Sequence, residues 1–208
     1  MLYKLHTQTT HFFINNDNKG TNMVYVFLAN GFEDIECLAT VDILRRGGID
    51  VKTVSTTGGE FVTSAHNVTV KADAMIEDTD LSNADLLVLP GGMPGAANLN
   101  GHETVRQALV AQAAKGGRIA AICAAPMVLG GLGLLEGRRA TCYPGFEKFL
   151  DGATYTAELA TTDGNITTGR GPAATMPFAY SLLEAFVGKK ATDEIRDGMI
   201  YTQLFEEA

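Results

Sequence analysis

The chain has 208 residues, of which 46% are hydrophobic and 23 are glycine, so it is long enough for one well-buried domain and short for two. Sixteen Lys and Arg against 24 Asp and Glu leave a formal net charge of −8, which disfavours nucleic acid as a partner, and no apolar run is long enough to span a membrane. The three cysteines lie far apart, with no Cys-x-x-Cys or metal-ligand spacing, so we expect a reducing, cytoplasmic setting and no metal.

The first 22 residues differ from the rest of the chain. They are polar and rich in Asn and Thr, and they lack the apolar core and cleavage site of a signal peptide. We expect residues 1–22 to be a tail outside the fold and residues 23–208 to form a single domain. The alternative is an over-extended start, because Met23 directly precedes the first convincing strand.

From residue 23 onward, strand-like and helix-like patterns alternate. Residues 24–29 and 51–55 predict strands, and residues 33–46 between them place apolar side chains on one helical face. This order is typical of a βαβ unit that opens an α/β fold. Residues 61–70 predict an edge hairpin or short strands.

The second half of the chain continues the alternation. Residues 84–89 predict a buried strand, and residues 102–115 predict a helix that ends at the Gly116-Gly117 pair. Further patterns predict a strand and helix around residue 123, strands at 139–142, 156–161 and 166–168, and helices at 172–187 and 192–199. The order indicates a mostly parallel central sheet covered by helices on both faces.

One cysteine stands where a buried strand turns directly into a helix. The segment 117–131 reads GRIAAICAAPMVLGG, and the small residues around Cys123 suit the tight turn of a nucleophile elbow. A helix N-terminus favours an anion, so we expect a partly ionised thiol, with a pKa of roughly 5 to 7 if the site is open to water. The alternative is a buried cysteine that packs as a small hydrophobic residue.

Other unusual segments also follow predicted strands, at residues 31–36, 90–95 and 169–172. Ligands of such sheets bind beyond the carboxyl ends of the strands, so we expect these segments to converge on Cys123. Glu36 is a candidate partner that hydrogen-bonds the sulfur, with a raised pKa and a shared proton for acid–base work. The alternative is an acid that complements the helix dipole, as we expect for Glu33 and Asp34.

A glycine pair predicts the remaining part of the site. The Gly91-Gly92 turn leaves its backbone N–H groups unblocked, and with the Ala124 N–H it predicts an oxyanion hole, although a tight turn needing positive φ explains the glycines equally well. His66 and His102 are the histidines of the domain, and we expect both to be exposed polar residues. Ala124 occupies the place of a neighbouring base, so a hydrolytic triad is disfavoured.

Four segments occur in the order and spacing of a known superfamily: GFEDIECLATVDILRRGGIDV, DLLVLPGG, IAAICAAP and GRGPAAT. The chain resembles the DJ-1/ThiJ/PfpI superfamily over about residues 23–190, and Ala124 after the cysteine indicates the DJ-1-like branch. The resemblance implies a flavodoxin-like three-layer sandwich that is usually a homodimer. It also implies that Cys123 is the reactive cysteine, Glu36 its hydrogen-bonded acid, and Gly92 and Ala124 the oxyanion donors.

The branch is associated with cofactor-free conversion of methylglyoxal to lactate, with deglycation of early aldehyde adducts, and with oxidation sensing or chaperone-like protection. We therefore expect a cysteine-dependent glyoxalase or deglycase that acts on a small aldehyde and needs no cofactor. The alternative is a non-enzymatic oxidative-stress sensor or chaperone-like protein that uses oxidation of Cys123. A further hint of a homodimer is the mixed helix face around Val41, Leu44 and Arg45.

The chain departs from the branch's best-known member near the expected pocket. Tyr143 stands in place of a histidine, His66 in place of an arginine that reaches toward the partner's pocket, and Gly169 in place of a serine. We expect these three residues, together with Gly91 and Arg170, to line the pocket, and the substrate preference and rate of that member do not transfer across the three changes.

Overall fold

The computed structural model describes residues 22–205, so the predicted tail lies outside the described residues except for residue 22. The central sheet consists of β1 (Met23–Leu28), β2 (Asp50–Ser55), β5 (Ala74–Met75), β6 (Leu86–Leu89), β7 (Arg118–Ile122), β10 (Ala160–Asp163) and β11 (Ile166–Gly169). The strand order is β10-β11-β7-β6-β1-β2-β5, and every neighbouring pair is parallel except β10 and β11. The prediction of a mostly parallel sheet is confirmed.

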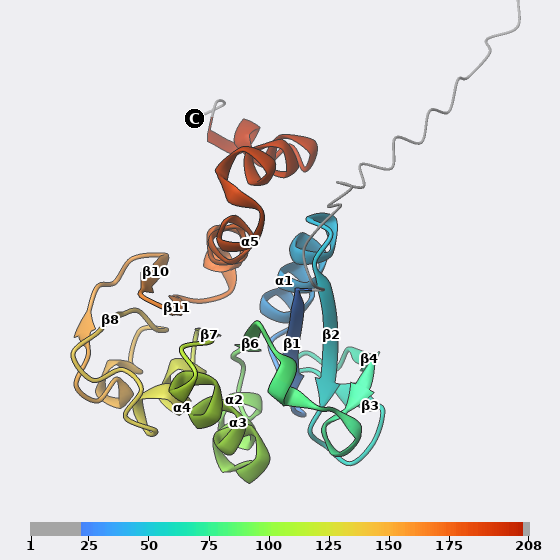
Figure 1. Cartoon of the computed structure of the whole chain (residues 1–208), viewed down its shortest axis with the longest axis vertical. Helices are drawn as coiled ribbons and strands as arrows, with labels where there is room; N and C mark the ends of the chain where they lie inside the picture. Colours follow the sequence, from blue (N-terminus) through green and yellow to red (C-terminus); the bar gives the residue numbers. More distant parts are fainter. Residues whose placement is uncertain (1–21, 206–208) are drawn as a thin grey trace, which may run out of the picture.

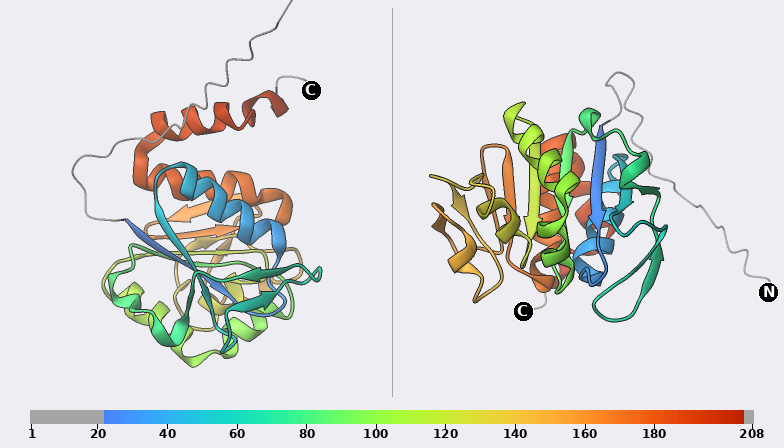
Figure 2. Two further views of the ribbon diagram at one scale, coloured as in Figure 1. Left: turned by 90° about the vertical axis from the view of Figure 1, so that its right-hand side faces the viewer. Right: turned by 90° about the horizontal axis from the view of Figure 1, so that it is seen from below.

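Helices cover both faces of this sheet, as the three-layer prediction requires (Figures 1 and 2). One face carries α1 (Asp34–Arg46) and α5 (Thr175–Gly198), and the other carries α2 (Gly95–Gly101), α3 (Glu103–Ala114) and α4 (Pro126–Gly130). Gly188, with φ of +77°, interrupts α5, so the two helices predicted near the C-terminus are the two arms of one bent element. None of the helices in residues 22–205 is long and apolar enough to cross a membrane.

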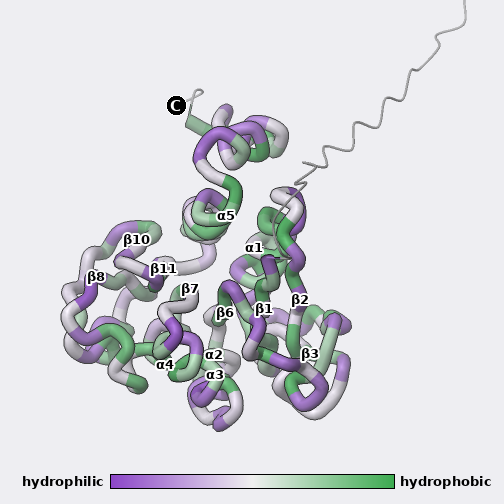
Figure 3. Tube along the Cα trace, viewed as in Figure 1, coloured by the Kyte–Doolittle hydropathy of each residue, from purple (hydrophilic) through white to green (hydrophobic). Residues whose placement is uncertain are grey.

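The central strands are buried on both faces, which explains their continuous apolar sequences. All four residues of β6 are buried, and in β7 only Arg118 at the start is exposed. Burying a large aliphatic side chain stabilises the fold by about 1.5–3 kcal/mol, so these strands anchor the loops that follow them. By contrast, α1 shows hydrophobic and hydrophilic stretches in turn along its length (Figure 3).

Smaller elements surround the sheet. The predicted hairpin at residues 61–70 is confirmed as β3 (Phe61–Thr63) and β4 (Thr69–Lys71), which pair with each other outside the main sheet. Short 3-10 helices add single turns at Ile76–Asp78, Leu81–Asn83, Glu147–Phe149, Pro172–Ala174 and Thr202–Phe205.

Three details differ from the sequence-based prediction. The strands expected at 139–142 and 156–161 are instead β8 (Arg139–Ala140), β9 (Thr154–Tyr155) and the later β10, because Ala157 has a φ of +57° and ends the extended segment. Helix α2 was not predicted, since glycine and asparagine make up four of its seven residues and a proline precedes it. It forms because Ala96 and Leu99 are buried and the Ala96 N–H donates to the Gly92 carbonyl.

Candidate active site

Cys123 lies directly after β7, in the turn that leads into α4. Its φ is +65°, a conformation that costs a non-glycine residue about 1–3 kcal/mol. Two backbone hydrogen bonds maintain it: the Cys123 N–H donates to the Gly169 carbonyl at 2.9 Å, and the Cys123 carbonyl accepts from the Tyr143 N–H at 2.9 Å. The predicted nucleophile elbow is therefore present, and Cys123 as a whole residue is 8% exposed.

Glu36 reaches the same point from the opposite side of the site. It lies in the first turn of α1, is 1% exposed, and accepts a hydrogen bond from the Gly91 N–H on Oε2 at 2.8 Å. A Cβ added to Gly91 would lie 2.6 Å from Cys123 Cβ and 2.7 Å from Glu36 Oε2, so the acid and the thiol face each other across this glycine. Oε1 is buried and has no N–H or O–H partner in the part of the chain that the structure describes.

Cys123 is buried, so the low thiol pKa expected for a site open to water does not hold. Burial, followed by the charge of Glu36 and its hydrogen bond to the thiol, raises the pKa of Cys123 to about 12, although the N–H groups of Gly92 and Ala124 oppose the shift. Burial raises the pKa of Glu36 to about 7, against the hydrogen bonds from Cys123 and Gly91. Because the two groups interact, their protons leave in two steps that belong to the pair, the first of them near neutral pH. The raised pKa expected for Glu36 agrees with this arrangement.

Two backbone donors point at the sulfur. The N–H groups of Gly92 and Ala124 both hydrogen-bond the Cys123 side chain, and each favours its charged form. Gly92 has a φ of +85°, and a Cβ there would lie 2.5 Å from the Glu33 nitrogen, so the turn accommodates only glycine. Donors aimed at one sulfur can also stabilise an oxyanion that develops on a carbon bound to that sulfur.

The five expected pocket residues do not all reach Cys123. Gly91 separates the thiol from Glu36, Gly169 contacts the Cys123 N–H through its carbonyl, and Tyr143 is 46% exposed beside them. The Arg170 guanidinium instead donates to the Ala157 carbonyl, and His66 hydrogen-bonds Asp34. Neither side chain has a described contact with Cys123.

A polar cluster beside α1 was missed by the sequence analysis, which assigned Glu33 and Asp34 only to the helix dipole. Glu33 is a buried N-cap whose side chain accepts the Glu36 N–H at 2.8 Å. Asp34 accepts from the Ser64 hydroxyl at 2.5 Å and pairs with His66 Nδ1 at 2.6 Å. Side-chain atoms of Glu33, Asp34 and His66 that could bind a metal ion lie within 4.8 Å of one another. The hydrogen bonds to Ser64 and His66, however, already use both Asp34 oxygens.

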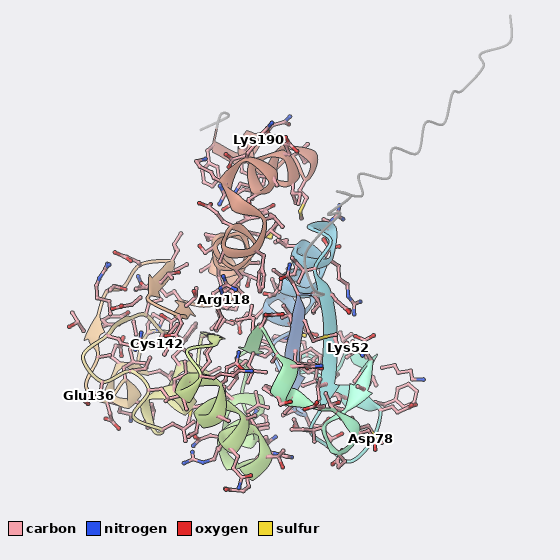
Figure 4. All side chains as sticks on the ribbon, in the orientation of Figure 1. Lys52, Asp78, Arg118, Glu136, Cys142 and Lys190 are labelled. Carbon is pink, nitrogen blue, oxygen red and sulfur yellow. The ribbon has the colours of Figure 1, made fainter. Side chains whose placement is uncertain are left out.

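The other two cysteines are free and fully buried, as the prediction of packing residues requires. Burial raises the pKa of the Cys37 thiol well above its usual range and that of Cys142 to about 12. Cys142 lies toward the β8 side of the molecule (Figure 4). A hollow of about 570 Å³ opens at the amino ends of β6 and β7, near Lys115 and Asn165, and does not include Cys123.

The model of the DJ-1/PfpI family matches residues 22–185. The crystal structure of DJ-1beta from Drosophila melanogaster superposes with a TM-score of 0.83 at 34% identity, covering 87% of this chain and 98% of that one.

Two curated relatives extend the comparison. Protein DJ-1 homolog B of Arabidopsis thaliana is 37% identical over 185 residues, which are 88% of this chain and 42% of that protein. The chain thus spans less than half the length of this relative. A Caenorhabditis elegans protein named glutathione-independent glyoxalase DJR-1.2 is 30% identical over 165 residues, which are 78% of this chain and 87% of that one.

Proposed function

Since this chain belongs to the DJ-1/PfpI family, we propose that it is a cofactor-independent, cysteine-dependent glyoxalase that converts methylglyoxal, or a related small aldehyde, into a 2-hydroxy acid. The observation that carries the proposal is the buried hydrogen bond between Glu36 and Cys123, along which one proton can pass, beside two backbone N–H donors. The name of the C. elegans relative supports the same reaction class.

The reaction begins with covalent attack. In the form of the pair that carries its proton on Glu36, the Cys123 thiolate attacks the aldehyde carbon and forms a carbon–sulfur bond. The carbonyl electron pair moves to oxygen, where the N–H groups of Gly92 and Ala124 stabilise the negative charge. Protonation of that oxygen by Glu36 gives a hemithioacetal and leaves Glu36 as a carboxylate.

Glu36 then transfers a proton between the two carbons. Its carboxylate removes the hydrogen from the carbon bound to sulfur, and the electron pair forms an enediolate with the adjacent ketone carbon. One proton moves between the two oxygens, and Glu36 returns its proton to the former ketone carbon. The aldehyde carbon is oxidised to a thioester while its neighbour is reduced to an alcohol, so no external oxidant or reductant is needed.

Water completes the cycle by attacking the thioester, so that the carbon–sulfur bond breaks and the Cys123 thiolate leaves. One proton of the water returns to Glu36 and the other is released with the 2-hydroxy acid anion, which balances methylglyoxal plus water. Deglycation of an early aldehyde adduct would first need the amine or thiol to leave, which restores the aldehyde that enters the same cycle. The narrow access to Cys123, which is 8% exposed, favours a small aldehyde.

The proposal includes a homodimer in a reducing, cytoplasmic compartment. The three free cysteines support the compartment. The helix face expected to mediate pairing is wrong in detail, because Val41 and Leu44 are buried in the core. Ile35 and Leu38 are the exposed apolar residues of α1, and they support pairing through the first half of this helix.

The test is production of lactate from methylglyoxal by the purified full chain without added glutathione. Cys123→Ser should abolish the activity, whereas Cys142→Ser, at a buried cysteine outside the site, should retain it. In D2O, the alcohol carbon should carry deuterium where the proton on Glu36 exchanges with solvent before its return, and should otherwise keep the hydrogen of the aldehyde carbon. Absence of lactate with the unmodified protein, or equal rates with Cys123→Ser, would overturn the proposal.

A further inference from the structure

Glu33 has no part in the proposed mechanism, yet its carboxylate is buried at the edge of the site. It is 7% exposed and precedes the first residue of α1. Burying a carboxylate is costly unless hydrogen bonds compensate it, and a helix N-cap is ordinarily a short side chain such as Ser or Asp. Its position therefore calls for a role beyond complementing the helix dipole.

The contacts of Glu33 connect the two halves of the site. Its side chain accepts the Glu36 N–H at 2.8 Å, while its own N–H donates to the Gly91 carbonyl at 3.0 Å. The Gly92 backbone lies directly against it, because a Cβ on Gly92 would come within 2.5 Å of the Glu33 nitrogen. One residue thus ties the helix that carries Glu36 to the turn that carries the backbone donors.

We propose that Glu33 is a positioning residue that acts through Glu36: it fixes the start of α1 against the Gly91–Gly92 turn, and its negative charge holds the shared proton on the Glu36–Cys123 pair. This inference rests on the proposed function, in which Glu36 is the proton partner of Cys123. A negative charge beside Glu36 serves the reaction, because attack requires the proton to reside on Glu36 while the sulfur is charged.

Among the described side chains that face Glu36, Glu33 is the one that contributes a negative charge. The groups that face Glu36 are the Cys123 thiol after β7, the Gly91 N–H after β6 and the Glu33 carboxylate beside α1. Asp34, the other acid of the first turn, is directed to Ser64 and His66 instead. After burial, the negative charge of Glu33 is the remaining cause that raises the pKa of Glu36.

Three substitutions separate the charge of Glu33 from its capping role. Glu33→Asp retains both the charge and a good cap, Glu33→Ser retains a cap without charge, and Glu33→Gln is nearly isosteric without charge. Asp34→Asn is the matched control, because it removes a neighbouring carboxylate that does not face Glu36. The measurement is the rate of alkylation of Cys123 by iodoacetamide from pH 5 to 9, read by peptide mapping, with thermal melting to verify folding.

We expect the midpoint of the pH–rate profile to fall by about one pH unit in Glu33→Ser and Glu33→Gln, since removal of a nearby like charge lets Glu36 ionise more easily. Glu33→Asp and Asp34→Asn should retain the midpoint of the unmodified protein. A purely structural role would lower the rate at every pH without moving the midpoint, and that result overturns the inference.

The profile also distinguishes this inference from the proposed function. Alkylation needs no substrate, so a shifted midpoint in a protein that makes no lactate would support the role of Glu33 and overturn the glyoxalase. An unshifted midpoint in a protein that makes lactate would overturn the role of Glu33 and support the glyoxalase. A role for the charge is contradicted if the midpoint rises in Glu33→Ser, or if it falls in Glu33→Asp by as much as in Glu33→Ser.

Discussion

Replacing Glu36 with glutamine should remove a pH-dependent loss of stability. Burial raises the pKa of this carboxyl from 4.5 to about 7 in the folded protein. Between these values the native state holds a proton that the unfolded chain has already released, so the free energy of unfolding falls as pH rises through this window. At about 1.36 kcal/mol for each pKa unit, the total loss is about 3 kcal/mol.

Glutamine does not titrate, so Glu36→Gln lacks this loss. Relative to the unmodified protein, the variant should gain about 3 kcal/mol in unfolding free energy between pH 4 and pH 8. Urea denaturation at several pH values measures the difference, provided that the m-value stays constant. Glu77→Gln, at an exposed acid, controls for the loss of a carboxylate in general. A difference that stays flat across this range would refute the assignment of the raised pKa to Glu36.

Three further outcomes follow from the geometry. Gly91→Ala should lower the free energy of unfolding by about 1–3 kcal/mol and slow alkylation of Cys123 about 100-fold, because its Cβ would lie 2.6 Å from Cys123 Cβ. Gly59→Ala is the control: a Cβ there would meet nothing within 4 Å, so stability and alkylation rate should both stay unchanged. Equal alkylation rates in the two variants would contradict this expectation. Mild peroxide should add two oxygens to Cys123, because Glu36 can hydrogen-bond the resulting sulfinate, and intact mass spectrometry measures the product. A Cys123 disulfide, or full activity after oxidation, would argue against the assigned Glu36–Cys123 pair. In sedimentation, the unmodified chain should form a homodimer and Leu38→Glu a 22.1 kDa monomer, whereas a monomeric unmodified chain at micromolar concentration would exclude the dimer.

The elbow around Cys123 was predictable because its requirements are local. A strand that is buried on both faces has a continuous apolar sequence, and a sharp turn at its end admits only small neighbours, so residues 119–125 carry both signals. The same reasoning applies to Gly91, where the structure leaves no room for a Cβ. Such features depend on sterics within a few residues of the strand ends.

The proton chemistry was not predictable from sequence, because it depends on burial. A helix N-terminus lowers a thiol pKa, but burial and the facing carboxylate of Glu36 outweigh that effect at Cys123. Glu33 was misjudged for a related reason, since an acid at the start of a helix has the same sequence pattern whether it is solvated or buried. Only packing against the Gly91–Gly92 turn distinguishes the two cases.

The site residues lie at or after the ends of four adjacent strands, apart from the loop residues that would contact a substrate. Gly169 ends β11, Cys123 follows β7, Gly91 follows β6, and Glu36 lies in the helix after β1, while the strand order is β11-β7-β6-β1. Because these strands are parallel and buried, their carboxyl ends hold the acid, the thiol and the glycine turn at fixed spacing. Tyr143 instead lies in a loop between strands with an exposed side chain. Changes in such loops should therefore alter which aldehyde the proposed glyoxalase accepts, while the Glu36–Cys123 pair stays in place.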